Sequence, residues 1–219
     1  WGDPVGLVAE QVRGNPADAE ANHGSEQRVV HRAHDGRHSG RCHRLHHEPL
    51  AGHLVELGHS ERRTHFGETD ETVARKVAAA LRNGLIALVC IGDTKEEHAA
   101  GATADVLARQ TRFALRDVAA AAAGKVILAY EPVWSIGEGG IPADPAFAND
   151  QHKRIKALTV EVCGRALPVL YGGSVKPQNC CDLALQSDID GLFIGRSAWN
   201  AEGYIGIIEA VTAALGEHA

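Results

Sequence analysis

The feature that most constrains the fold is an alternation of apolar, strand-like segments with amphipathic helical patterns after residue 53. Turns marked by glycine or proline separate these segments. Because parallel strands need a crossover between them, usually a helix, the alternation predicts an α/β protein with a parallel sheet. Five strands are expected, at residues 54–57, 85–91, 126–130, 167–171 and 192–194.

Helices are expected between these strands and after the last one, because apolar residues recur there with the spacing of one helical face. Asn200 is available to cap the last helix. The four predicted faces are Val73, Val77 and Leu81; Ala99, Ala102, Val106 and Phe113; Ile155, Leu158 and Val162; and Ile208, Val211 and Leu215.

The first 53 residues do not share this pattern, and no strand is predicted among them. Residues 28–47 contain five arginines and six histidines against one acid, Asp35. Such a segment is too polar to bury enough surface to offset its ordering entropy. We therefore expect residues 1–53 to be atypical and poorly ordered, attached to an α/β core at residues 54–219.

Three interpretations of this basic segment remain open. Cys42 with His43, His46 and His47 could ligate zinc, although the spacing matches no common zinc finger. The arginines could form a basic arm for RNA or an acidic partner, but no aromatic residue lies between them. The third interpretation is an aberrant N-terminus encoded out of frame, because the composition changes abruptly just before Leu54.

Composition narrows the class of protein and its surroundings. The 219 residues include 44% apolar and 23% charged ones, which is ordinary for a soluble globular protein. A formal charge of -6 argues against nucleic acid as the main partner. No apolar run approaches the ~18 residues of a membrane span, and nothing resembles a signal peptide. The five cysteines lack CxxC spacing, which favours a reducing, cytoplasmic compartment.

Two residues at expected strand ends are candidates for chemistry. Glu131 follows an apolar strand, and Pro132 restricts Glu131 to extended backbone, which holds the carboxylate at the end of the strand. His59 follows the first expected strand, where a helix could begin. The positive end of a helix disfavours imidazolium, so His59 should be neutral and able to donate to a carbonyl oxygen. An equally compatible role for His59 is a helix-entry residue bonded to nearby backbone.

Three glycine-rich segments, at residues 136–140, 171–175 and 191–197, predict an anion-binding site. Glycines let backbone N–H groups approach a phosphate closely, and Ser174 adds a hydroxyl. Two of these segments follow the last two expected strands. That is the usual phosphate site of eight-stranded α/β barrels.

Four segments, in this order, resemble the triosephosphate isomerase family: Gly-His-Ser-Glu-Arg-Arg at 58–63, Val-Cys-Ile-Gly at 89–92, Tyr-Glu-Pro-Val-Trp-Ser-Ile-Gly at 130–137 and Tyr-Gly-Gly-Ser-Val at 171–175. The resemblance covers about residue 54 to the C-terminus. It implies one TIM (β/α)8-type barrel domain over 1–219, with irregular or incomplete N-terminal βα units. It also implies interconversion of dihydroxyacetone phosphate and glyceraldehyde 3-phosphate through an enediolate, without metal or organic cofactor.

The resemblance also assigns catalytic roles. Glu131 is then the base that moves a proton between adjacent carbons, and His59 polarises the substrate oxygens. Glu61 is a supporting carboxylate near the site.

The loop at 132–142 resembles the family's lid, which closes over the phosphate and excludes water. Pro132, Val133 and Trp134 begin this lid, with Trp134 as a hinge anchor. The phosphate-contacting positions of the family fall on Gly137, Ser174 and Gly195. For Arg196 two roles stay open, a further phosphate contact or a solvated surface arginine.

Departures from the family bear on substrate and activity. The family's Asn-x-Lys motif has no counterpart, since the first lysine is Lys76, on an expected helix. Its loss leaves open a catalytically silent barrel or binding protein. Gly195-Arg196 and the lid ending at 140–145 resemble a branch that isomerises four-carbon ketose phosphates, which makes tetrulose (erythrulose) phosphate an alternative substrate. The family implies a homodimer, but the motif of its dimer-forming loop is also missing.

Overall fold

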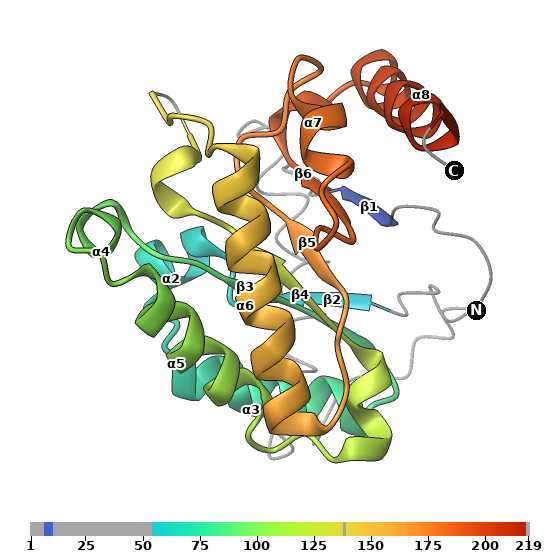
Figure 1. Ribbon diagram of the computed structural model, residues 1–219. Coiled ribbons are helices and arrows are strands. Elements are labelled where there is room, and N and C mark those ends of the chain that lie inside the picture. Colours follow the sequence, from blue (N-terminus) through green and yellow to red (C-terminus); the bar gives the residue numbers. More distant parts are fainter. Residues whose placement is uncertain (1–6, 11–53, 138, 218–219) are drawn as a thin grey trace, which may run out of the picture.

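The computed structural model describes residues 7–10, 54–137 and 139–217. These residues form an α/β structure around one six-stranded parallel sheet in the order β1-β6-β5-β4-β3-β2, as in part of a barrel (Figure 1). The predicted α/β barrel-type fold is thereby confirmed. The strands are β1 (Leu7–Glu10), β2 (Leu54–Leu57), β3 (Ile86–Ile91), β4 (Val126–Tyr130), β5 (Val169–Tyr171) and β6 (Gly191–Ile194).

All five strands predicted after residue 53 are present, with ends shifted by at most two residues. The prediction that no strand lies before residue 54 was wrong, because Leu7–Glu10 forms β1 and pairs in parallel with β6. A four-residue segment carries too little pattern to be recognised alone, and its partner lies far away in the sequence. The basic segment at 28–47 and the zinc hypothesis for Cys42 lie outside the described residues.

Helices follow the strands in the sequence and pack against the sheet. In Figure 1, α3, α5 and α6 lie next to one another over one face, and α3 packs on β3 while α6 packs on β5. The α-helices are α2 (Ser60–Phe66), α3 (Asp70–Arg82), α4 (Lys95–Ala99), α5 (Thr103–Leu115), α6 (Pro145–Cys163), α7 (Cys180–Ala184) and α8 (Ala201–Glu217). The short 3-10 helices are η2 (Ala120–Lys125), η3 (Val133–Ser135) and η4 (Arg196–Ala198).

One predicted helical face was wrong. Ala99 ends α4 and Thr103 begins α5, so the face drawn from Ala99 to Phe113 is divided between two helices. The break falls at Gly101, which has a left-handed φ of 71° that glycine adopts at little cost. Val106 is buried on α5, whereas Phe113 is only partly buried.

Side-chain capping explains where several helices start. Thr69 and Thr94 each form a reciprocal capping box at the start of α3 and α4. Asp144 accepts from the Phe147 N–H at 3.0 Å, and Pro145 occupies the first turn of α6. Asn200 accepts from the Gly203 N–H at 2.7 Å, which confirms it as the cap of α8.

The strands separate two buried clusters. Alternate residues face opposite sides of a strand, so Val89 and Ile91 of β3 pack under the helices while Leu88 and Cys90 point the other way. This second, smaller cluster consists of Leu88, Cys90, Ala129, Leu170 and Phe193, with Ile127 packed against it. Because side chains fill both faces, a site can form only at the ends of the strands, and in parallel α/β folds it lies at the carboxyl ends.

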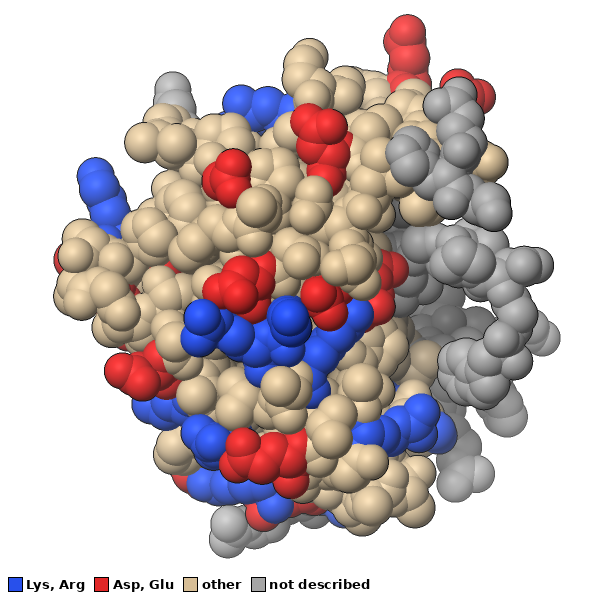
Figure 2. All heavy atoms as spheres, in the orientation of Figure 1, with Lys and Arg blue, Asp and Glu red and all other residues tan. Residues whose placement is uncertain are grey.

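Opposite charges adjoin one another on part of the surface. Figure 2 shows lysine and arginine side chains bordered by acidic ones, and on α6 Arg154 pairs with Asp150 while Lys156 pairs with Asp190. Exposed pairs of this kind add little stability. Among the helices of the described residues, none combines the length and apolarity needed to cross a membrane.

His152 on α6 is fully buried between aromatic rings, with its ring centroid 6.0 Å from that of Tyr130 and 6.2 Å from that of Tyr171. Burial lowers the pKa of His152 to about 3, and the charge of Lys156 acts in the same direction. The unfolded chain therefore takes up a proton on this residue at a pH where the folded chain does not.

Replacing His152 by phenylalanine should reduce the loss of stability in mild acid. Since the folded pKa lies below the ordinary value of 6.5, stability is fully present above pH 6.5 and falls as the pH drops. Between pH 7.5 and 5 the wild-type chain should lose about 2 kcal/mol of unfolding free energy through this residue. H152F should not show that component in urea denaturation at the two pH values. An equal loss of unfolding free energy between pH 7.5 and 5 in the wild-type chain and in H152F would contradict this.

Candidate active site

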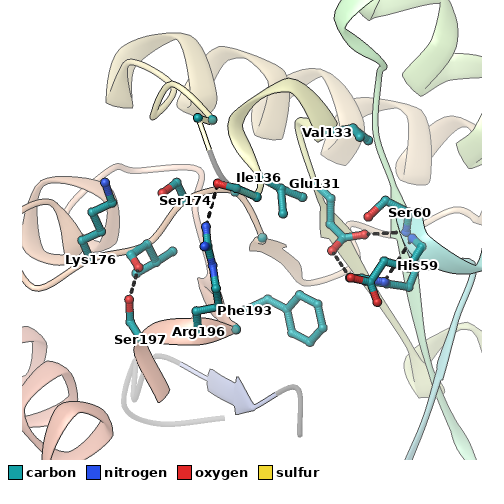
Figure 3. Close-up of a pocket in the computed structure, with 18 of the residues that line it drawn as sticks. His59, Ser60, Glu131, Val133, Ile136, Ser174, Lys176, Phe193, Arg196 and Ser197 are labelled. Carbon is teal, nitrogen blue, oxygen red and sulfur yellow. Dashed lines mark hydrogen bonds and ion pairs between the residues drawn. The ribbon is translucent and has the colours of Figure 1, made fainter. Parts of the chain in front are cut away.

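A cavity of about 970 Å³ opens at the carboxyl end of the sheet. Residues that follow four different strands line it, namely β2, β4, β5 and β6 (Figure 3). All seven residues predicted to act in catalysis or phosphate binding lie on its wall: His59, Glu61, Glu131, Gly137, Ser174, Gly195 and Arg196. The topology therefore gathers into one space residues that are up to 137 positions apart, from His59 to Arg196.

Glu131 is held at the end of β4 with 2% of its surface exposed. Its Oε1 lies 2.9 Å from His59 Nε2, and its Oε2 accepts from the Ser60 backbone N–H at 3.3 Å (Figure 3). The Glu131 N–H donates to the Ile91 carbonyl at 2.7 Å, which fixes the backbone beside β3. A Cβ atom at Gly92 would come within 1.7 Å of the Glu131 carbonyl oxygen, so this close approach requires glycine.

His59 caps the N-terminus of α2 and is buried. Its Nδ1 accepts the Glu61 backbone N–H at 3.3 Å, so in the neutral ring the hydrogen must be on Nε2, facing Glu131. Burial lowers the pKa of His59, but the hydrogen bond and charge of Glu131 outweigh it, and the net pKa is raised above 6.5. The acceptor role of Nδ1 requires a neutral ring, whereas Glu131 raises the pKa of His59 and favours the protonated ring, so the neutral imidazole stays a prediction.

Glu61 lies in the first turn of α2 and lines the same cavity. Its position at the positive end of the helix suits a carboxylate. The prediction did not include Ser60, whose N–H donates to Glu131. The signal was available, because the residue after a helix-capping histidine has a backbone N–H with no partner within the helix.

Glycine and serine residues after β5 and β6 form the opposite wall. A Cβ atom at Gly172 would lie 2.9 Å from Glu131 Cγ, so the backbone there must lack a side chain for the carboxylate to fit. Ser197 Oγ donates to the Val175 carbonyl at 2.6 Å and ties the two loops together. Ser174 and Gly195 also line the cavity.

The segment predicted to be the lid includes η3, and its first residues are anchored by Asp93, a fully buried carboxylate that sequence reasoning missed. Trp134 Nε1 donates to Asp93 Oδ2 at 3.2 Å, and the Val133 N–H donates to the Asp93 carbonyl at 3.0 Å. Trp134 is thus held in place by Asp93, and its role as the hinge anchor of a lid stays a prediction. Tyr130 Oη and Thr103 Oγ1 donate to the same carboxylate at 3.2 and 2.7 Å.

Tyr130 remains a donor to Asp93, because burial and then the charge of Asp93 raise the pKa of its phenol far above the ordinary value. His98 stacks on the Trp134 ring at a centroid distance of 4.1 Å, with its Nδ1 3.3 Å from Asp93 Oδ2. The start of the lid is therefore fixed by polar and aromatic contacts to the loop after β3.

Four further residues on the wall were given no role of their own by the prediction, although Ile136 and Phe193 lie within the predicted segments 136–140 and 191–197. Ile136 in the lid and Phe193 on β6 supply apolar surface near Glu131. Lys176 and Trp199 are exposed at the margin. Lys76, in contrast, is 3% exposed, is bonded to Glu68 and is not among the residues that line the cavity.

A parallel strand–helix barrel with polar residues gathered at the carboxyl ends of its strands defines the TIM-barrel class of proteins. The family model described as triosephosphate isomerase matches residues 12–211. The chain therefore belongs to the triosephosphate isomerase family.

Several curated relatives are named L-erythrulose-1-phosphate isomerase. The protein of Rhizobium etli is 56% identical over 163 residues, which is 74% of this chain and 61% of the relative. Those of Rhizobium rhizogenes and Rhizobium meliloti are 52% and 54% identical, again over 74% of this chain and over 62% and 64% of the relative. The chain thus matches somewhat under two thirds of the length of these relatives.

Replacing Asp93 by asparagine should loosen the anchor of the lid. An amide offers one acceptor oxygen and turns an N–H₂ group towards donors, so a buried donor loses its partner. D93N should lower the unfolding free energy by about 1–3 kcal/mol. Urea denaturation measures this loss, and amide hydrogen exchange should become faster at residues 133–135.

W134F is the matched variant, because it removes one donor to Asp93 and leaves Tyr130 and Thr103 in place. It should cost about 1 kcal/mol, less than D93N. Equal stability of D93N and the wild-type chain would show that Asp93 does not anchor the lid.

Proposed function

We propose that this chain isomerises a small ketose phosphate by proton transfer between adjacent carbons, with L-erythrulose 1-phosphate as the preferred substrate. The observation that carries the proposal is the buried Glu131 carboxylate, 2.9 Å from the His59 imidazole in a cavity with a glycine-lined wall. The names of the relatives support the four-carbon substrate over the triose phosphate expected first. Interconversion of dihydroxyacetone phosphate and glyceraldehyde 3-phosphate is the second candidate.

Glu131 is the base in this proposal. The carboxylate takes the proton from the hydroxyl-bearing carbon next to the carbonyl, and the electrons of that C–H bond form the carbon–carbon double bond of an enediolate. The carbonyl electrons move to oxygen at the same time. Returning the proton to the former carbonyl carbon completes the isomerisation with no net change in oxidation state.

His59 moves protons between the two substrate oxygens. With Nδ1 held by the Glu61 N–H, the Nε2–H is the group that can turn from Glu131 to a substrate oxygen. Donation to the developing negative charge stabilises the enediolate, and electrostatic stabilisation of this kind is often the largest catalytic contribution. Carboxylate and imidazole suffice for these steps, so the proposal includes neither metal nor organic cofactor.

The phosphate is placed at Gly137, Ser174 and Gly195. These three residues line the cavity, and their backbone N–H groups and the Ser174 hydroxyl would be neutral donors to the phosphate. Pro132, Val133 and Trp134 form the fixed start of the lid, which in this proposal closes over the bound substrate and excludes water. A monomer or a homodimer is compatible with these roles.

Replacing Glu131 by glutamine should abolish most of the activity. The amide keeps the size of the side chain but cannot take a proton, so kcat should fall about 10²- to 10⁴-fold. Initial rates on L-erythrulose 1-phosphate measure this, with dihydroxyacetone phosphate as the comparison substrate. The wild-type kcat/KM should be higher for the four-carbon compound.

E161Q is the matched control, since Glu161 lies exposed on α6, pairs with Arg112 and is not among the residues that line the cavity, so its effect should be much smaller. Preference for dihydroxyacetone phosphate would assign the triose reaction instead. If neither substrate turns over and E131Q resembles the wild-type chain, the protein is a silent barrel.

The acid limb of kcat/KM should lie above pH 6.5. The raised pKa of His59 keeps a proton on the His59–Glu131 pair to higher pH than in a free histidine, and this proton blocks the base or the neutral imidazole. Rates from pH 5 to 9 on the free enzyme measure the midpoint, which belongs to the pair. In H59Q the limb should move to lower pH and kcat should fall. A wild-type midpoint below 6.5 would contradict this assignment.

A further inference from the structure

Arg196 extends from the loop after β6 across the cavity to the lid. Its Nη2 donates to the Gly137 carbonyl at 2.6 Å, although the two residues are 59 positions apart. Figure 3 shows the guanidinium between Ser174 on one side and Phe193 on the other. Arg196 therefore lies among the residues assigned to the phosphate. Its bond to the Gly137 carbonyl distinguishes it from a surface arginine that contacts only solvent.

The charges on the cavity wall give this side chain a second role. Among the described lining residues, the carboxylates are Glu61 and Glu131 and the permanent cations are Lys176 and Arg196. The expected phosphate donors Gly137, Ser174 and Gly195 are all neutral. A phosphate dianion entering this wall adds negative charge near two carboxylates, so a cation must compensate it.

Of the two cations, Arg196 is the better placed. A guanidinium has five N–H donors in a rigid fork, and the structure uses one nitrogen at the Gly137 carbonyl. The remaining donors can bind two phosphate oxygens while the bond to the lid persists. A lysine ammonium is a point charge on a flexible stem and cannot hold both partners with the same geometry.

We propose that Arg196 is a substrate-binding residue that joins the phosphate dianion to the lid through one guanidinium. The inference rests on the proposed function for the identity of the substrate, but the anion site itself can be tested without turnover. It resolves the choice between a phosphate contact and a surface arginine in favour of the contact. Bridging also links phosphate binding to the position of Gly137 in the lid.

The test is calorimetric titration of the intact chain with inorganic phosphate. R196Q should weaken phosphate binding about 10- to 100-fold, which is the range expected for a charge-assisted hydrogen bond. R196K should recover part of the affinity. R154Q removes the same charge from the exposed face of α6, outside the cavity wall, and should bind phosphate as the wild-type chain does.

Amide hydrogen exchange tests the contact between Arg196 and Gly137 separately. Phosphate should slow amide hydrogen exchange at residues 136–137 in the wild-type chain, and this protection should be lost in R196K even where phosphate still binds. Equal phosphate affinity of R196Q and the wild-type chain would overturn the inference. Equal protection in R196K would overturn the bridge to the lid.

Kinetics separate this inference from the proposed function. If the wild-type chain turns over L-erythrulose 1-phosphate, R196Q should raise KM about 10- to 100-fold, more than it lowers kcat. An unchanged KM in R196Q would refute the role of Arg196 and leave the activity standing. Weaker phosphate binding in R196Q, with no turnover by either chain, would refute the activity and leave the anion site standing.

Discussion

The contact between the Glu131 carboxylate and the His59 imidazole is the interaction on which the rest of the site depends. The two side chains follow β4 and β2, which are separated by β3, so their distance of 2.9 Å depends on parallel register across three strands. The approach also needs Gly92, where a Cβ atom would collide with the Glu131 carbonyl. Burial then raises the cost of leaving either group without a partner, which is why the Ser60 and Glu61 N–H groups complete the pair.

The lid is tied to the barrel at two places by different chemistry. At its start, Asp93 accepts from Trp134 and the Val133 N–H donates to the Asp93 backbone, in a fully buried setting. At its tip, an exposed arginine after β6 reaches the Gly137 carbonyl. A buried anchor resists opening, whereas an exposed one is exchanged more readily for solvent or a ligand. The first residues of this segment are thus held by buried contacts and Gly137 by an exposed one.

Much of the fold and of the site could be predicted from local pattern. The strands from β2 to β6 are short apolar runs bounded by turns, and Glu131 and His59 each follow one of them. Asp93 was missed because a buried carboxylate resembles any polar loop residue until its three side-chain donors, which come from separate segments, are brought together. β1 was missed because its pairing with β6 joins the two ends of the sequence.

The sequence by itself determined the order of strands and helices, the type of each catalytic candidate and the positions of the glycines. These depend on neighbouring residues, through hydrophobic periodicity, proline and glycine geometry, and helix capping. Tertiary structure alone decided which of these groups meet: that Glu131 faces His59, that Lys76 is buried against Glu68, and that Arg196 reaches the lid. The reason is physical, since distances between residues far apart in the chain are set by sheet register and packing, which no local pattern encodes.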